Sequence, residues 1–463
     1  MPHHAVPRFV ASTTWDQLPD DVRERARLCT LDNLGAMLSG LAAPSAAIAA
    51  GTAGRLWGGD EATVVKSGVR ASVAGAAFAN AVAANGTDID DCGVYTLGHP
   101  GAQILPAALA LAEHGSLPGH ALLRATVVGY EVAFLAGRCV HDSETYYYRS
   151  CGSWGSLACA AVAANLMGLD TEATAHALGI AEYHSPYAPM FRDVDAPAMV
   201  KHACGWGAAT GVTAAVLAAQ GFTGCPSILE DEKYRGWVDD VGRPFLITTG
   251  IMWKKHSCCA WTHPALDALE EILRRQPVAA DDVRRIRAVV YRDAVRLGLR
   301  QPETTEEAQF NLAWPLAVRL VDGEVSPAQV LEPRLGDPRV RALAARVEME
   351  ESEEFTWLYD LSCDEDPEGA DMARVVLELR DGTVLDSGPV HSDVYPDHPW
   401  GRGELARKFR WLARPLLPGA TVEQLIEMVL RLDEVEDSRE LLRVIKAGLR
   451  PEQAERHHTK GDT

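Results

Sequence analysis

A succession of alanine-rich apolar segments fills the first half of the chain and restricts the fold more than any other feature. These segments lie at 71–84, 104–113, 121–138, 155–167, 171–181 and 197–219, and glycine, alone or after asparagine, closes several of them. Before them, Asp20 to Leu38 begins with acidic residues and places leucines on one helical face. No segment with strand-like alternation stands out before about residue 245. The pattern predicts an all-helical first domain of tightly packed helices.

The pattern then becomes a mixture of strands and helices. We predict strands at Arg284–Tyr291, Val340–Glu348 and Ala373–Leu379, and helices at Pro264–Arg275 and Thr305–Leu320. Residues 260–395 therefore form a smaller α+β unit. Helices return at 403–415 and 421–431, and the polar tail that ends in His457-His458-Thr459-Lys460 is expected to be disordered or a last frayed helix.

Composition and charge exclude several classes of protein. The chain has 463 residues, 47% of them hydrophobic, and its formal net charge is −20. This charge argues against nucleic acid and anionic membrane surfaces as partners. The ten cysteines show no regular framework, the N-terminus does not resemble a signal peptide, and no apolar run is long enough to span a bilayer. We expect a cytoplasmic protein with free thiols.

The most informative stretch runs from Asp88 to Gly101. Asp88, Asp90, Asp91 and His99 lie on a glycine-bearing connection between two apolar segments. A solvated surface loop would also explain the acids. Carboxylates beside a histidine at the mouth of two buried helices are, however, what a general acid/base site needs, because burial and neighbouring charges shift their pKa values.

Other basic residues are candidates for anion binding. Lys201 and His202 open the apolar segment that ends at Ala219, where a lysine opposes the helix dipole unless an acid or an anionic ligand compensates it. Lys254 and Lys255 lie where the helical part gives way to the α+β part, and such junctions often bind ligands. Snorkelling lysines are the alternative.

Arg149 follows Tyr146-Tyr147-Tyr148 and precedes Gly152-Ser153-Trp154-Gly155. A guanidinium there could clamp a carboxylate, or it could be stacked and structural. Cys151-Gly152-Ser153-Trp154 only faintly matches the papain signature, because Trp154 occupies the position of the nucleophile.

His256, Cys258, Cys259 and His263 could form a metal cluster, but adjacent cysteines are poor zinc chelators, and packed free thiols are the alternative. No nucleotide fingerprint, phosphate loop or nucleophile elbow is present in the sequence.

Together these segments resemble the MmgE/PrpD family, which includes 2-methylcitrate dehydratase, cis-aconitate decarboxylase and iminodisuccinate epimerase. The resemblance is carried by Asp88–Asp91 with Gly98–Gly101, by Gly152–Gly155, by Met199–Lys201, and by the run from Lys254 through Cys258-Cys259 to His263-Pro264. It implies a mainly α fold with a large helical domain from both chain ends, residues 1–255 and 398–463. Residues 256–397 would form an inserted, smaller α+β lid domain.

The resemblance also implies a homodimer, no metal or organic cofactor, and an active site at the domain junction. The family's acidic residue and histidine fall on Asp88 and His99, and its two lysines fall on Lys201 and Lys254. Cys92 stands where some members carry threonine. Arg149 stands where dehydratase-like and decarboxylase-like members carry a histidine.

We therefore expect a cofactor-independent lyase, similar to a dehydratase, that acts on a small di- or tricarboxylic acid by α-proton abstraction and elimination. His99 would act as acid/base, with Asp88 orienting it or sharing the proton. Lys201, Lys254 and Arg149 would bind carboxylates, and one of the two lysines could be a second acid/base. Cys92, Arg149, His202 and Lys255 are candidates for substrate binding. An isomerase, epimerase or decarboxylase on a related polycarboxylate, and a non-catalytic anion-binding protein, are the alternatives.

Overall fold

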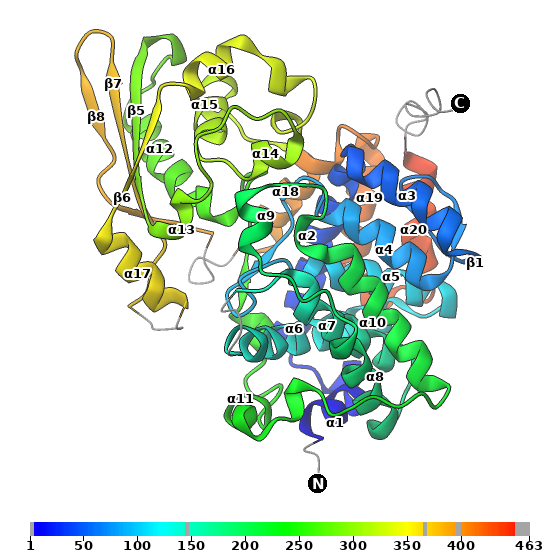
Figure 1. The fold of residues 1–463 in the computed structure, drawn as a ribbon. Helices are drawn as coiled ribbons and strands as arrows, with labels where there is room; N and C mark the ends of the chain where they lie inside the picture. The colour runs from blue at the N-terminus through cyan, green and yellow to red at the C-terminus, as the bar shows by residue number, and fades with distance from the viewer. Residues whose placement is uncertain (1–3, 144–147, 364–367, 395–399, 450–463) are drawn as a thin grey trace, which may run out of the picture.

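The computed structural model describes residues 4–143, 148–363, 368–394 and 400–449 (Figure 1). The predicted tail lies beyond these residues. The helices of the first part are α1 (Ala5–Ser12), α2 (Asp20–Gly40), α3 (Pro44–Leu56), α4 (Val73–Ala84), α5 (Gly101–Gly115), α6 (Gly119–His141), α7 (Cys151–Met167), α8 (Thr171–Tyr183), α9 (Phe191–Asp195), α10 (Cys204–Ala219) and α11 (Arg235–Val238). After residue 400 follow α18 (Arg402–Ala413), α19 (Gly419–Leu430) and α20 (Arg439–Gly448).

The helices from the two ends of the chain share one hydrophobic core. Figure 1 shows α18, α19 and α20 beside α2 and α3, and α18 packs directly on α2. Small residues permit the close packing: a Cβ at Gly155 of α7 or at Gly207 of α10 would lie 2.0 Å from Gln103 Oε1 of α5. Gln103 in turn donates to the carbonyl of His99 (3.3 Å), so this packing also positions the start of α5.

The intervening segment builds a second core around a small sheet. Its helices are α12 (His263–Arg275), α13 (Arg292–Val295), α14 (Thr305–Gln309), α15 (Ala313–Asp322), α16 (Pro338–Ala344) and α17 (Glu353–Cys363). Its strands are β5 (Val283–Val290), β6 (Val347–Glu351), β7 (Met372–Leu379), β8 (Val384–Asp386) and β9 (Val390–His391). The strand order is β6-β5-β7-β8, with β9 also on β7; among the described residues of this sheet, β5 and β6 are parallel and the other pairs are antiparallel. The mainly α fold class with a smaller α+β part is confirmed.

Several local predictions need correction. The predicted strand Val340–Glu348 is helix α16 followed by β6, because the Asp337 carboxylate accepts hydrogen bonds from the backbone of Arg339 and Val340 and starts a helix at Pro338. The predicted helix Thr305–Leu320 is broken between α14 and α15, where Asn311 Oδ1 caps the Trp314 amide at 2.8 Å.

Two further differences concern the first half. Short strands β1 (Gly58–Thr63) and β2 (Arg70–Ala71) form a hairpin, and β3 (Cys92–Gly93) pairs with β4 (Ile251–Met252). The segment predicted as a helix from residue 197 becomes α-helical only at Cys204. Across the described ranges no single helix is long and apolar enough to cross a membrane, although the bent pair α2 and α3 meets the length and composition criteria together.

Candidate active site

The segment between α4 and α5 is buried, so the surface-loop alternative is wrong. Asp88, Asp90 and Asp91 have no exposed surface, and His99 is 5% exposed. Asp88 has a φ of 56°, a left-handed conformation that acidic and amide residues tolerate better than most. The chain thus turns three carboxylates into the protein, where each needs a partner.

Asp90 is the partner of His99. Its Oδ2 lies 2.8 Å from His99 Nδ1, whereas Asp88 Oδ1 lies 3.6 Å from His99 Nε2. Because a carboxylate only accepts, Nδ1 carries the proton and Nε2 holds the lone pair. Burial lowers the pKa of His99 below its usual value although Asp90 opposes this shift, so the ring is a neutral base at neutral pH. The sequence had suggested that Asp88 orients His99, but the closer contact is made by Asp90.

Asp88 instead bridges the two lysines. Lys201 Nζ lies 3.3 Å from Asp88 Oδ1, and Lys254 Nζ lies 3.2 Å from Asp88 Oδ2 and donates to its carbonyl oxygen at 3.0 Å. Burial alone would raise the pKa of Asp88, but the charges of the two lysines lower it well below its usual value. The structure therefore supplies the acidic neighbour that a lysine near the start of the α10 segment requires.

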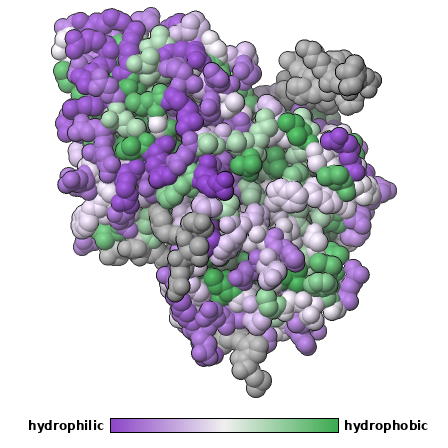
Figure 2. Space-filling model, in the orientation of Figure 1, coloured by the Kyte–Doolittle hydropathy of each residue, from purple (hydrophilic) through white to green (hydrophobic). Residues whose placement is uncertain are grey.

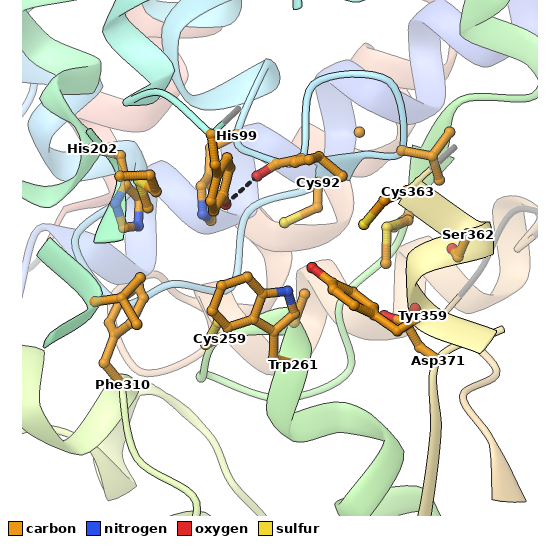
Figure 3. A pocket seen from close by; sticks show the side chains of 18 residues that line it. Cys92, His99, His202, Cys259, Trp261, Phe310, Tyr359, Ser362, Cys363 and Asp371 are labelled. Atoms are coloured by element: carbon orange, nitrogen blue, oxygen red, sulfur yellow. Dashed lines mark hydrogen bonds between the residues drawn. The ribbon is translucent and has the colours of Figure 1, made fainter. Parts of the chain in front are cut away.

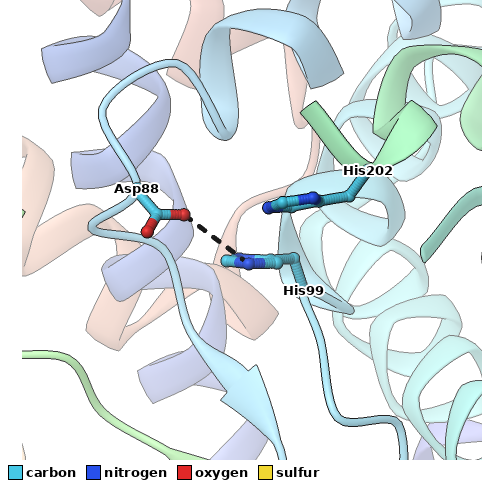
Figure 4. Close-up of side chains that lie close together, drawn as sticks. All are labelled: Asp88, His99 and His202. Atoms are coloured by element: carbon cyan, nitrogen blue, oxygen red, sulfur yellow. Dashed lines mark ion pairs between the residues drawn. The ribbon is translucent and has the colours of Figure 1, made fainter. Parts of the chain in front are cut away.

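His202 stacks on His99 (Figure 4). The ring centroids are 4.9 Å apart and the planes differ by 16°. Lys201, His202 and Ala203 have φ values of 24°, 59° and 59°, so three consecutive residues without glycine lie in the left-handed region. This conformation is unfavourable, and such strain is concentrated at functional sites.

Asp193 of α9 makes His202 the acidic member of the pair. Asp193 Oδ2 lies 2.9 Å from His202 Nδ1 and accepts the His202 backbone N–H at 2.8 Å. Burial alone would lower the pKa of His202, but the hydrogen bond and charge of Asp193 raise it. Environments that push the pKa values of two adjacent groups apart assign one as base and the other as acid.

A cavity opens in front of this pair, between the two cores (Figure 3). Of the residues predicted for catalysis or substrate binding, Cys92, His99 and His202 line it, and Cys259 of the predicted cysteine–histidine cluster lines it too. The opposite wall comes from the α+β part, with Phe310, Trp261 and Tyr359 among the labelled side chains. Burial raises the pKa of Cys92 well above its usual value, so this thiol is neutral.

Two predicted substrate contacts lie elsewhere. The Arg149 guanidinium stacks over Tyr187, 3.6 Å from the ring centroid, and donates to Ser143 Oγ at 3.0 Å. Lys255 forms ion pairs with Asp267 and, at 2.7 Å, with Asp393, and it lines a separate cleft with Glu270 and Arg319. Neither residue lines the cavity in front of His99.

Possible metal ligands converge at more than one place in the described ranges. His263, from the predicted cysteine–histidine cluster, receives the His256 N–H on Nε2 (3.3 Å) and contacts the Cys259 carbonyl through Nδ1 (3.2 Å), so both ring nitrogens are engaged. Asp88, His99 and His202 also converge closely enough to share a cation. The ammonium groups of Lys201 and Lys254 already compensate the charge of Asp88.

Sequence reasoning missed several contributors. Asp90 was visible within the motif, but no local pattern shows that it, rather than Asp88, faces Nδ1. Asp193 and Gln309 reach the site only through tertiary structure: Gln309 Oε1 accepts from Lys201 Nζ at 2.6 Å. Lys408, far along the chain, donates to the Ile89 carbonyl at 2.8 Å and supports the same loop.

Comparisons with known proteins agree with this architecture. The MmgE/PrpD N-terminal domain matches residues 5–245 and the MmgE/PrpD C-terminal domain matches residues 256–434. The cis-aconitate decarboxylase of Aspergillus terreus (strain NIH 2624 / FGSC A1156) is 26% identical over 94% of both chains. The cis-aconitate decarboxylase of Homo sapiens is 28% identical over 94% of this chain and 93% of the relative. The chain belongs to the MmgE/PrpD family, and it is an enzyme of the lyase type.

Proposed function

We propose that the protein eliminates water from a small hydroxylated di- or tricarboxylic acid by proton abstraction at the carbon next to a carboxylate. The observation that carries the proposal is the stacked pair of His99, which contacts Asp90, and His202, which contacts Asp193, with ring centroids 4.9 Å apart at the cavity wall. Elimination of water needs a base and an acid at the same time, and this pair supplies both.

In the proposed step, His99 Nε2 removes the α-proton. The C–H electron pair becomes the new C=C bond, the C–O bond breaks, and His202 Nε2–H protonates the departing hydroxyl, so water leaves. Asp90 keeps the Nδ1–H of His99 in place and stabilises the imidazolium that forms. Asp193 raises the pKa of His202, so that His202 takes up a proton from solvent again between turnovers.

Decarboxylation is the second candidate, because relatives from Aspergillus terreus and Homo sapiens are named cis-aconitate decarboxylases. In that reaction a C–C bond breaks, CO₂ leaves, and His202 delivers its proton to the carbon that held the carboxylate. His99 would then not be needed as a base. An isomerase or epimerase would use both histidines without a leaving group.

The three reactions are separated by proton NMR in heavy water together with a bicarbonate assay. The panel is citrate, 2-methylcitrate, cis-aconitate and substituted hydroxy acids. A new alkene without bicarbonate supports dehydration, bicarbonate supports decarboxylation, and deuterium exchange without either supports an isomerase. A protein that binds panel acids but catalyses no change would refute the enzymatic proposal.

Substitutions test the assigned roles. His99→Asn and His202→Asn should each lower kcat by about 10²–10⁴-fold, since each removes a general acid or base. His184→Asn, on the exposed end of α8, is the matched control and should leave kcat unchanged. If His99→Asn retains dehydration at the normal rate, His99 is not the base.

We also propose that the chain forms a homodimer and that residues 1–255 and 398–463 form one folding unit with 256–397 as its lid. The helical part exposes large apolar side chains that a second copy would cover. Figure 2 shows apolar colours gathered over the helical part, whereas the α+β part is mostly hydrophilic in this view. Exposed residues of α3, the segment before α10 and α10 itself include Ile48 (60%), Leu56 (71%), Val200 (68%) and Trp206 (53%).

A further inference from the structure

Two connections join the helical part of the protein to the α+β part. The chain leaves the helical part after β4 and returns to it between β9 and α18. The first connection carries Lys254 and Lys255 and leads into α12, and the second begins with Ser392 and Asp393. Because the cavity lies between the two parts, contacts at these connections influence how its walls face each other.

One buried carboxylate, that of Asp267 in α12, holds both connections. Its Oδ2 accepts hydrogen bonds from Ser392 Oγ (2.7 Å) and from the Asp393 backbone N–H (3.3 Å). Its Oδ1 pairs with Lys255 Nζ, which also lies 2.7 Å from Asp393 Oδ1. Asp267 is only 8% exposed, so solvent ions screen these contacts little. The two connections are thus tied together at one side chain.

Lys254, the neighbour of Lys255 in the chain, contacts the helical part instead. Its ammonium group lies 3.2 Å from Asp88 Oδ2 and donates to the Asp88 carbonyl at 3.0 Å. Just before Lys254, β4 pairs with β3, so this segment is also held to the loop that carries Asp88 and His99. Consecutive lysines therefore link the acid beside His99 to the acid that holds both connections, and a displacement of Lys255 reaches Lys254 through a single peptide unit.

The α+β part also supplies a wall of the cavity directly beside the histidines. Phe310 packs edge-on against His202, with ring centroids 5.2 Å apart. Trp261 lines the cavity and lies two residues before α12, the helix that carries Asp267. A shift of α12 against the helical part would therefore change the distance from Trp261 to His99 and His202.

We propose that Lys255 and Asp267 are positioning residues of the active site. Their ion pair keeps the two connections side by side. It thereby holds Lys254 against Asp88, and it keeps the Trp261 wall at the distance from the two histidines that the reaction requires. This inference rests on the proposed function for the reaction and adds to it residues that act through their neighbours. A purely structural ion pair would stabilise the fold without affecting turnover.

Lys255→Met tests the inference, because it removes the cation and keeps a side chain of similar length. Other contacts still join the two parts, such as the hydrogen bond from Gln309 Nε2 to the Gly86 carbonyl at 3.1 Å, so the variant should fold. Since a misplacement of about 1 Å can cost about 10²-fold in rate, we expect kcat/KM to fall by about 10²-fold. Lys255→Arg restores the charge, and the open cleft beside Lys255 has room for the guanidinium, so it should recover kcat/KM to within about 5-fold of the wild type.

Arg334→Met is the matched control. Arg334 pairs with Asp322 in the same α+β part, and its side chain is 24% exposed against 18% for Lys255. Neither Arg334 nor Asp322 lines the cavity. With the panel acid that the wild type turns over fastest, this variant should keep kcat/KM within about 2-fold while its melting temperature falls.

The kinetic comparison can overturn the inference in two ways. It is wrong if folded Lys255→Met keeps kcat/KM within about 2-fold of the wild type, or if Arg334→Met loses as much as Lys255→Met. Should Lys255→Met not fold, Asp393→Asn, at a half-exposed position, removes one of the anions that hold Lys255. It should lower kcat/KM by about 3- to 10-fold, and an unchanged kcat/KM would then refute the role of Lys255.

Hydrogen exchange separates this inference from the proposed function, because it needs no turnover. The Val94 amide donates to the Gly250 carbonyl at 3.0 Å, beside the β3–β4 pair. A displaced Lys254 should loosen this pair, so peptides that cover residues 88–94 should exchange at least about 3-fold faster in Lys255→Met than in Arg334→Met. If the exchange changes in this way but the wild type turns over no acid of the panel, the proposed function fails and the positioning of this loop by Lys255 stands. If the exchange is the same in both variants, the positioning inference fails, whatever the turnover.

Discussion

Replacement of Asp88 by asparagine tests the central electrostatic arrangement of the site. The change keeps the size of the side chain and suits the backbone, because asparagine tolerates the left-handed φ of 56° at this position. It removes only the negative charge between Lys201 and Lys254. Two buried ammonium groups would then lack their counter-ion.

The expected cost follows from the distances. Asp88 Oδ2 lies 3.2 Å from Lys254 Nζ, and unit charges at this distance attract by about 5 kcal/mol at an effective dielectric constant of about 20. Desolvation offsets much of this attraction in the native protein, and removal of one partner from a buried pair costs about 3–5 kcal/mol. We therefore expect Asp88→Asn to lower the free energy of unfolding by about 3–5 kcal/mol.

Asp91, three residues further, is a matched control whose replacement should depend on pH, whereas that of Asp88 should not. Burial, with the charge of Asp32, raises the pKa of Asp91 to about 7. Its Oδ1 accepts the Gly101 amide at 3.0 Å, a bond that asparagine can keep. Asp91→Asn should cost about 1 kcal/mol or less at about pH 5.5, where a neutral amide replaces a largely neutral acid in the folded protein.

The two substitutions should change stability with pH in different ways. The pKa of Asp88 is lowered, so its contribution to stability is present above the unfolded-state pKa and is lost only as pH falls through the low folded value. The loss in Asp88→Asn should therefore be constant between about pH 5.5 and 8.5. The pKa of Asp91 is raised, so the wild type loses stability as pH rises from about 4 through about 7, and Asp91→Asn should gain relative to it by up to about 1.4 kcal/mol per pH unit.

Urea unfolding followed by far-ultraviolet circular dichroism, repeated across this pH range, measures both effects. The reasoning is refuted if Asp88→Asn loses less than about 1 kcal/mol. It is equally refuted if the loss in Asp88→Asn changes with pH over this range or if the stability of Asp91→Asn relative to the wild type does not rise with pH.

Three further predictions concern the neighbours of the site. Asp193→Asn removes the charge that raises the pKa of His202, so the alkaline limb of kcat against pH should move down by about one unit, and an unmoved limb would exclude His202 as the acid. Arg149→Lys should lower the melting temperature but change KM by less than about 2-fold, since the guanidinium stacks on Tyr187 outside the cavity, and a tenfold rise in KM would show substrate contact. Trp206→Lys should shift the sedimentation of the protein to that of a monomer, whereas Val384→Lys, on an equally exposed apolar position of β8, should not.

The pH profile of the wild type follows from the same two histidines. The reaction needs His99 neutral and His202 protonated. Activity should rise as pH passes above the lowered pKa of His99 and fall as pH passes above the raised pKa of His202. Initial rates with the best substrate over the neutral range measure both limbs, and a profile with a single limb would contradict the pairing of base and acid.

Much of the fold was predictable because its signals are local. The apolar segments with their glycine stops predicted α4 to α8, and the alternating Arg284–Tyr291 and Ala373–Leu379 predicted β5 and β7. The wrongly predicted strand at Val340–Glu348 shows the limit of such signals. Its apolar residues alternate as in a strand, but the N-cap made by Asp337 starts helix α16 there. The hydrogen bonds that the Asp337 carboxylate accepts from the backbone outweighed the alternation of apolar residues.

The sequence by itself determined which residues the site could use, since Asp88, Asp90, His99, Lys201, His202 and Lys254 lie in the quoted motifs. Only the tertiary structure decided how they pair. Asp90 rather than Asp88 holds His99, Asp193 comes from a separate short helix to charge His202, and Arg149 and Lys255 turn away to other partners. Residue types and spacing are properties of one chain segment, whereas a pKa and an ion pair depend on groups that meet across 100 residues or more of chain, as in Lys201 with Asp88 and Lys254 with Asp88. Burial then fixes the outcome, because each charge taken out of water must find its counter-ion among the groups that the packing brings within reach.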